Sequence, residues 1–169
     1  MKNKIFFFLL IFFLQVFIFN KIYFFNALIL SPIILIFLLF NHYKNSFFLL
    51  TLAFFLGFLI DIFNDSHGTF SFGLTILVFI RNYWIEVYFP IDKIPVNSFF
   101  SSYQIGLKSF FYYSFPLIII FQSFIYLIEI NSLANFPNYL IKILLSSFLT
   151  FVLVLILQLL LFSSNSRYE

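Results

Sequence analysis

Uninterrupted apolar runs constrain this chain more than any other feature. Residues 5–14 are apolar on every side, and hydrophobic residues make up 63% of the 169 residues. Charged residues make up only 9% of the chain, whereas a soluble globular domain needs about 25% to cover its surface. The composition therefore predicts an integral membrane protein.

The same runs also indicate the kind of membrane fold. Because the hydrocarbon core offers no water to the backbone, spanning segments are either helices or strands of a closed barrel. Barrel strands alternate apolar and polar residues, and the apolar runs of this chain show no such alternation. We expect an all-α integral membrane protein, a bundle of transmembrane helices.

The apolar segments predict one polytopic transmembrane domain, 1–169, with six spans and with five as the alternative. A straight helical span needs about 20 residues to cross about 30 Å, so several of the segments are expected to be short or broken. The second segment is the weakest and could be re-entrant or tilted, although Ser31-Pro32 suits a first helical turn. The predicted spans are 5–19, 27–40, 47–63, 69–87, 110–128 and 139–162, with a loop at 90–109.

The basic residues predict the orientation, since cytoplasmic loops carry an excess of Lys and Arg. Six spans with an inner N-terminus leave both termini cytoplasmic and the 90–109 loop inside. In this arrangement only Lys21 and Lys142 lie outside. The basic residues assigned to the inside are Lys2, Lys4, Lys44, Arg81, Lys93, Lys108 and Arg167.

A polar stretch interrupts the hydrocarbon at the end of the third segment. Gly57 and Asp61 are four residues apart and share one helix face, and Asp65 would follow on that face if the helix continued. A carboxylate at membrane depth costs about 2.5–3.5 kcal/mol on insertion scales, so it needs a partner, water or a function. Gly57 would let a neighbouring backbone approach closely, and Gly68 ends the stretch.

Four interpretations of this stretch are open, and the fourth, a proton relay, would need more ionisable residues within the spans than the few that are there. In the first, Asp61 and Asp65 are solvated at the outer boundary, and residues 64–66 supply an N-cap for the fourth helix. In the second, Asp61 is held by a polar group of another helix or subunit. In the third, Asp61, Asp65 and His67 bind a divalent metal, which is disfavoured because their spacing matches no known ligand pattern.

Other polar residues point to packing rather than to chemistry. Gln15, Gln122 and Gln158 lie within apolar spans, where each can hydrogen-bond to another helix. The sequence has no Cys, no catalytic constellation and no Gly-rich phosphate loop, and its basic residues are scattered singly. We therefore expect no enzyme, no cofactor, no metal and no nucleic-acid partner.

The order of these features resembles the bacterial rod shape-determining family MreD, in the form found in Bacteroidetes-like bacteria. The matching parts are Leu14-Gln15-Val16 in the first span, a Pro-containing second segment, and the Gly57, Asp61 and Gly68 pattern. The residue after the second glycine is Thr69 here, where the family commonly has Leu or Met.

The resemblance implies a non-enzymatic inner-membrane component of the cell-elongation machinery. Its implied partners are an MreC-like single-span protein and, indirectly, an MreB-like filament and a glycan polymerase–transpeptidase pair. It also implies packing or partner-contact roles for Gln15, Gly57, Asp61, Asp65 and Gly68. The alternative is a small-molecule capture subunit of a multi-component transporter, which the isolated glutamines and single polar stretch favour less.

Overall fold

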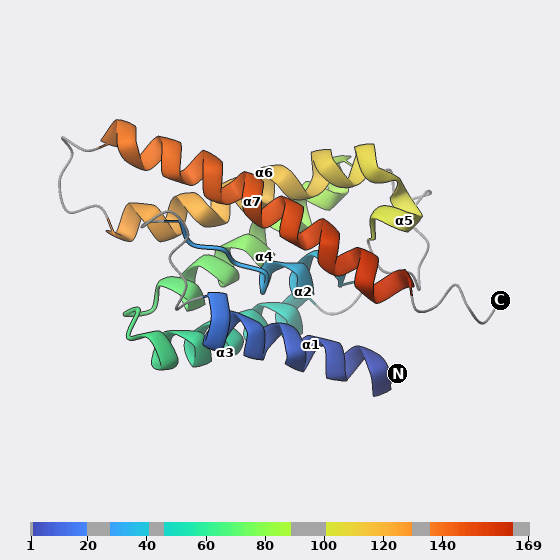
Figure 1. Ribbon diagram of the computed structural model, residues 1–169, viewed down its shortest axis with the longest axis horizontal. Coiled ribbons are helices and arrows are strands. Elements are labelled where there is room, and N and C mark those ends of the chain that lie inside the picture. The colour runs from blue at the N-terminus through green and yellow to red at the C-terminus, as the bar shows by residue number, and fades with distance from the viewer. Residues whose placement is uncertain (1, 20–27, 41–45, 89–100, 130–135, 164–169) are drawn as a thin grey trace.

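The computed structural model describes residues 2–19, 28–40, 46–88, 101–129 and 136–163 (Figure 1). Four helices in these ranges are long and apolar enough to cross a membrane. They are α3 (Ser46–Asn64), α4 (Thr69–Tyr88), α6 (Leu107–Glu129) and α7 (Phe136–Ser163). Their bounds differ from the predicted segments by three residues or fewer. The prediction of an all-α membrane bundle is confirmed.

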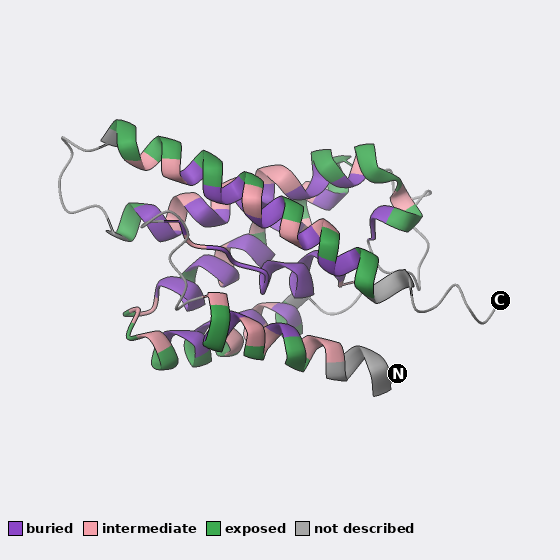
Figure 2. Ribbon diagram, viewed as in Figure 1, coloured by how far each residue is buried: buried purple, intermediate pink, exposed green. Residues whose placement is uncertain are grey.

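The four long helices pack in chain order. Helix α4 lies between α3 and α6, and α7 packs on the other side of α6, so α7 and α3 lie at opposite sides of the bundle in Figure 1. The faces turned toward neighbouring helices are buried, while the outer faces of α3 and α7 are exposed (Figure 2). Large hydrophobic side chains such as Phe54, Phe58, Leu144 and Phe148 cover those outer faces, as expected of surfaces that meet lipid.

The first predicted span, 5–19, is helical over its whole length. Helix α1 (Lys2–Leu14) continues into a π-helical turn, η1 (Gln15–Phe19), which contacts α3. A π-helical turn widens the helix locally and often marks a functional or packing constraint. Here it buries Gln15 and Val16 while Phe17 and Ile18 stay exposed.

The second predicted span, 27–40, is only half helical. Residues 28–30 form no helix, Pro32 lies in an opening turn as predicted, and α2 covers only Ile34–Leu39. The amides of Ile34 and Leu35 donate to the carbonyls of Ser31 and Pro32, three residues back. All residues from Ser31 to Leu39 are buried, and α2 lies inside the bundle (Figure 2).

This broken geometry lets thirteen residues cover nearly the depth of a membrane. An extended residue advances about 3.3 Å, a 3₁₀ residue about 2.0 Å and an α-helical residue 1.5 Å. From 28 to 40 the chain therefore advances about 25 Å, against about 18 Å for a regular α-helix of the same length. The segment runs antiparallel to α6, because Ile29 bonds to Tyr126 and Leu38 bonds to Tyr113.

The predicted loop at 90–109 is helical in its last part. Helix α5 (Ser102–Ile105) follows the extended Ser101, and α6 begins at Leu107, earlier than expected. Gly106 separates the two helices with a φ of 82°, a conformation that glycine adopts without steric cost. Residues 90–100 of the predicted loop lie outside the described residues.

Candidate functional site

The α3–α4 corner, residues 57–71, begins with a close contact between two backbones. A Cβ atom placed on Gly57 would lie 2.4 Å from the Cα of Ser71, 2.6 Å from its nitrogen and 2.7 Å from the carbonyl oxygen of Phe70. All three atoms belong to the backbone of α4 and cannot swing aside. Gly57 is therefore the residue that lets α3 and α4 meet at the predicted packing face.

Asp61 lies one turn further along α3 and binds the start of α4. One carboxylate oxygen accepts hydrogen bonds from the Ser66 hydroxyl and from the Phe70 amide at 2.9 Å, and the other accepts from the Ser71 amide at 2.8 Å. The first amides of a helix have no partner within the helix, and its N-terminus carries a partial positive charge. Asp61 satisfies two of these amides and places its negative charge against that end.

This arrangement corrects the first interpretation of the polar stretch. Asp61 is 6% exposed rather than solvated, and it is Asp61 that caps the amides of Phe70 and Ser71. The physical reason is the tight turn between antiparallel helices, which brings the end of α3 beneath the first amides of α4. The second interpretation, a carboxylate held by another helix, describes the geometry.

The turn between the two helices leaves two polar side chains outside. Asp65 and His67 are exposed, and both have left-handed backbone conformations, with φ of 51° and 49°. Such a conformation is uncommon for residues other than glycine. Gly68 follows with a φ of 88°, and its carbonyl accepts hydrogen bonds from the Ser71 hydroxyl and the Phe72 amide. Asp65 and His67 thus lie on a short turn whose ends are fixed by the hydrogen bonds of Asp61 and Gly68 to the start of α4.

The metal interpretation of the corner gains no support. Within the described ranges, no group of three or more His, Asp or Glu residues is arranged to hold a metal ion. The Asp61 carboxylate is bound to the amides of α4, while Asp65 and His67 are exposed.

A second polar assembly holds the extended part of the 28–40 segment. Tyr126 on α6 accepts a hydrogen bond from the Ile29 amide, and Gln122 donates to the Ile29 carbonyl. Gln15 donates to the Leu30 carbonyl and accepts from the Ile33 amide, both at 3.3 Å. Non-helical backbone is tolerated at membrane depth only where protein or water satisfies it. These side chains take the place of helical hydrogen bonds.

The predicted bonding of glutamines to other helices is confirmed in part. Gln122 also donates to Thr150 on α7, at 3.1 Å. Gln158 accepts from the Ser102 amide and so attaches α5 to α7. The main partners of Gln15 and Gln122, however, are backbone groups of an extended segment, because that segment has no helical partners of its own.

Arg81 was predicted to lie among the basic residues on the inner side of the membrane, and this side stays a prediction, but the structure places the side chain within the helix bundle. Its side chain is fully buried in α4. Its Nε donates to the Tyr113 hydroxyl at 2.8 Å, its Nη2 donates to the Phe40 carbonyl, and Tyr113 in turn donates to the Leu38 carbonyl. The last carbonyls of a helix have no partner within it and carry partial negative charge, so Arg81 and Tyr113 cap α2.

Sequence reasoning missed Arg81, Tyr113 and Tyr126 as structural residues. One signal was present: an arginine at the thirteenth position of a twenty-residue apolar helix is expensive in hydrocarbon and needs an interior partner. The tyrosines gave no comparable signal, because the chain has ten of them.

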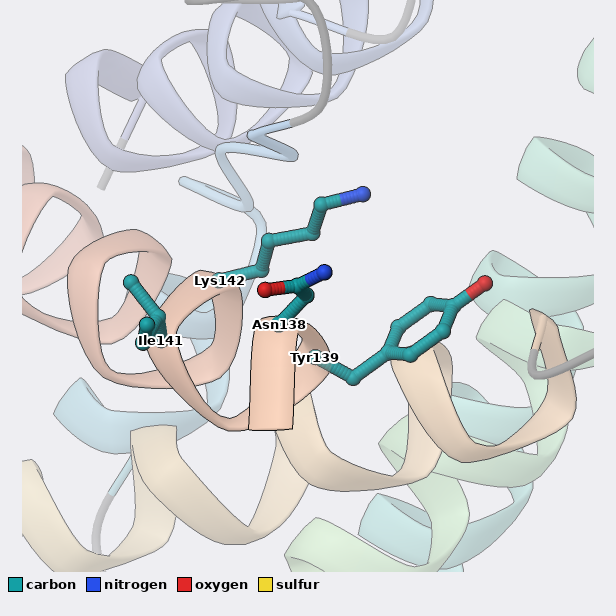
Figure 3. Close-up of a pocket in the computed structure, with 4 residues that line it drawn as sticks. All are labelled: Asn138, Tyr139, Ile141 and Lys142. Carbon is teal, nitrogen blue, oxygen red and sulfur yellow. The ribbon is translucent and has the colours of Figure 1, made fainter. Parts of the chain in front are cut away.

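A shallow hollow of about 390 Å³ lies at the start of α7. It is lined by Asn138, Tyr139, Ile141 and Lys142 (Figure 3). The Lys142 ammonium lies 5.1 Å from the centre of the Tyr139 ring. The lining side chains are exposed or half-buried, which makes this hollow a surface feature rather than an enclosed ligand chamber.

Comparisons of this chain with known protein families, with curated proteins and with solved structures find no match. The α3–α4 corner and the polar assembly around the 28–40 segment are therefore the features of the chain that bear on its function.

Proposed function

We propose that this protein is an MreD-like, non-enzymatic subunit of the bacterial inner membrane that organises side-wall peptidoglycan synthesis by contact. The observation that carries the proposal is the α3–α4 corner. The Gly57, Asp61 and Gly68 pattern of the resemblance lies in it: Gly57 allows the backbone contact, Asp61 caps α4, and Gly68 adopts a positive φ in the turn. A rigid corner with exposed polar side chains is suited to docking.

The proposed partner is an MreC-like single-span protein, through which the subunit would act on an MreB-like filament and a glycan polymerase–transpeptidase pair. Asp61 already accepts three hydrogen bonds within the chain, so it is a positioning residue in this proposal. The exposed Asp65 and His67 are the docking residues, on the outer side of a membrane in which both termini are cytoplasmic.

The proposal is tested by replacing the exposed residues without disturbing the corner. The double variant Asp65→Asn, His67→Asn should lose co-purification with the single-span partner, and cells that carry it should round while wall precursors are still made. Its thermal stability should stay close to wild type, because both side chains are exposed and asparagine tolerates the left-handed backbone conformation of these positions. Lys142→Gln, a change at the start of α7, serves as the matched control and should retain the partner.

The second candidate is a small-molecule capture subunit of a membrane transporter. The observation that favours it is the interrupted interior segment 28–40, since transporters commonly place such broken helices at their substrate sites. In this chain, however, the backbone groups of Ile29, Leu30 and Ile33 that lack helical partners are already bound by Gln15, Gln122 and Tyr126. Tight binding of a vitamin-sized ligand by the purified chain, with retention of the partner by the Asp65/His67 variant, would replace the scaffold proposal with this one.

A further inference from the structure

The second half of α4 carries a buried charge, Arg81, whose hydrogen-bond partners among the described residues are uncharged. Arg81 donates from Nε to the phenol of Tyr113 and from Nη2 to the carbonyl of Phe40. Its Nη1 is buried and has no hydrogen-bond acceptor among the described residues. A buried donor without an acceptor costs about 1–3 kcal/mol, and more when it is charged. The guanidinium is therefore incompletely satisfied.

The indole N–H of Trp84, on the same side of α4, is a second buried donor without an acceptor among the described residues. Trp84 lies three residues after Arg81, which places the two side chains one above the other on neighbouring parts of the helix surface. Its ring packs against the hydrophobic core, and its Nε1 is buried without an acceptor in the described part of the chain. Two buried N–H donors on adjacent turns thus share the lack of an acceptor.

From these two donors we infer that Arg81 and Trp84 form a binding site for a phosphate group. A phosphate offers several oxygens with negative charge, so one group can accept from the guanidinium and from the indole together. Arginine is the side chain best suited to such oxygens, because its planar fork matches their geometry. The inference is independent of the scaffold proposal, which concerns the opposite end of α4.

The depth of the site fits a phosphate that enters from the membrane surface. Arg81 precedes Tyr88, the last residue of α4, by seven residues, or about 10 Å along the axis of a helix about 30 Å long. The Arg81 side chain is fully buried, so a phosphate reaches it when the side chains around it move aside. Either a phospholipid headgroup or a free phosphate ion carries the required group.

The chain's single tryptophan allows the site to be read directly. Trp84 is the only Trp in the sequence, so the emission of the purified full chain in an uncharged detergent reports on this turn of α4. Titration with dioleoyl phosphatidylglycerol should give a saturable change in emission. A matching response to inorganic phosphate would add the free ion as a ligand, and a response to the lipid alone would restrict the site to headgroups. The inference is overturned if neither the lipid nor inorganic phosphate gives a saturable response larger than that of chloride at equal ionic strength.

Two variants separate binding from a purely structural role. Trp84→Phe removes the N–H and keeps an aromatic ring, so its binding is followed by the thermal stabilisation that the lipid confers. We expect roughly 10- to 100-fold weaker binding, the loss typical of a hydrogen bond to a charged group, with an unchanged or higher melting temperature without lipid. Arg81→Lys, which keeps the charge without the fork, should also bind more weakly.

Lys142→Gln is the control for general attraction to anionic lipid, because Lys142 lies on α7 at the surface hollow. It should bind as the wild type does. Wild-type affinity in Trp84→Phe, or an equal loss in Lys142→Gln, would show that the phosphate is not held at this turn of α4.

Discussion

Replacing Gly57 by alanine should separate α3 from α4 and break the cap at Asp61. The new Cβ would lie 2.4 Å from the Ser71 Cα, whereas ordinary contact begins near 3.4 Å, so the two backbones must part by about 1 Å. The bonds from Asp61 to the Phe70 and Ser71 amides, now 2.9 and 2.8 Å, would then exceed hydrogen-bonding range.

The size of the effect follows from these two losses. Overpacking costs about 1–3 kcal/mol, each bond to the carboxylate is worth about 1.5–3 kcal/mol, and alanine returns about 1 kcal/mol of helix propensity. The smallest of these values, with two bonds lost, leave a net cost of about 3 kcal/mol, so we expect Gly57→Ala to lower the free energy of unfolding by at least about 3 kcal/mol. Equilibrium unfolding in mixed detergent micelles, followed by the emission of Trp84, measures it.

Gly73→Ala is the matched control, since Gly73 also lies within a helix at a helix–helix contact. Its new Cβ would meet ring atoms of Phe121 at 3.1 and 3.3 Å, and a ring edge can shift where a backbone cannot. We expect a change of about 1 kcal/mol or less. Equal destabilisation by the two variants, or a stable Gly57→Ala protein, would refute the argument that backbone contact at Gly57 sets the corner.

The remaining predictions concern the polar groups and the orientation. Asp61→Asn turns one acceptor into a donor that faces an α4 amide, so it should lower the free energy of unfolding by about 2–3 kcal/mol in the same assay. The exposed Asp65→Asn should change it by less than about 0.5 kcal/mol. Comparable losses in the two variants would contradict the capping role of Asp61. Tyr126→Phe removes the acceptor of the Ile29 amide and should lower the free energy of unfolding by about 1–3 kcal/mol. Hydrogen exchange at that amide should also become faster. Unaltered exchange would count against the role given to Tyr126. In the chain's cysteine-free background, a cysteine at His67 should react with an impermeant reagent in intact cells and one at Lys108 only after permeabilisation, and the reverse pattern would invert the proposed topology.

The long helices could be predicted because hydrocarbon imposes a simple rule. A segment that crosses it must be long and apolar. The polar residues around Asn64 mark the end of α3, and Thr69 marks the start of α4. The face shared by Gly57 and Asp61 could also be predicted, since positions four apart are fixed by helix geometry.

The partners of the buried polar groups could not be predicted, because they depend on packing between distant parts of the chain. Asp61 caps amides nine and ten residues away across a turn, and Arg81 reaches a carbonyl 41 residues earlier. A hydropathy scale treats Arg81 as a charge that belongs outside the hydrocarbon. Only the position of the C-terminal end of α2 shows why the side chain is buried within the bundle.

The extended start of the 28–40 segment has a consequence for the order of assembly. Its Ile29 amide and carbonyl depend on Tyr126 and Gln122, which lie 97 and 93 residues later in the chain. Unpaired backbone groups are costly in hydrocarbon, so this segment gains a stable place only after α6 has been synthesised and inserted. Its insertion is then a late event in biogenesis, although its sequence comes early. A chain that ends before Gln122 would lack the two α6 side chains that bind the Ile29 backbone, so the 28–40 segment would not be held stably in the membrane.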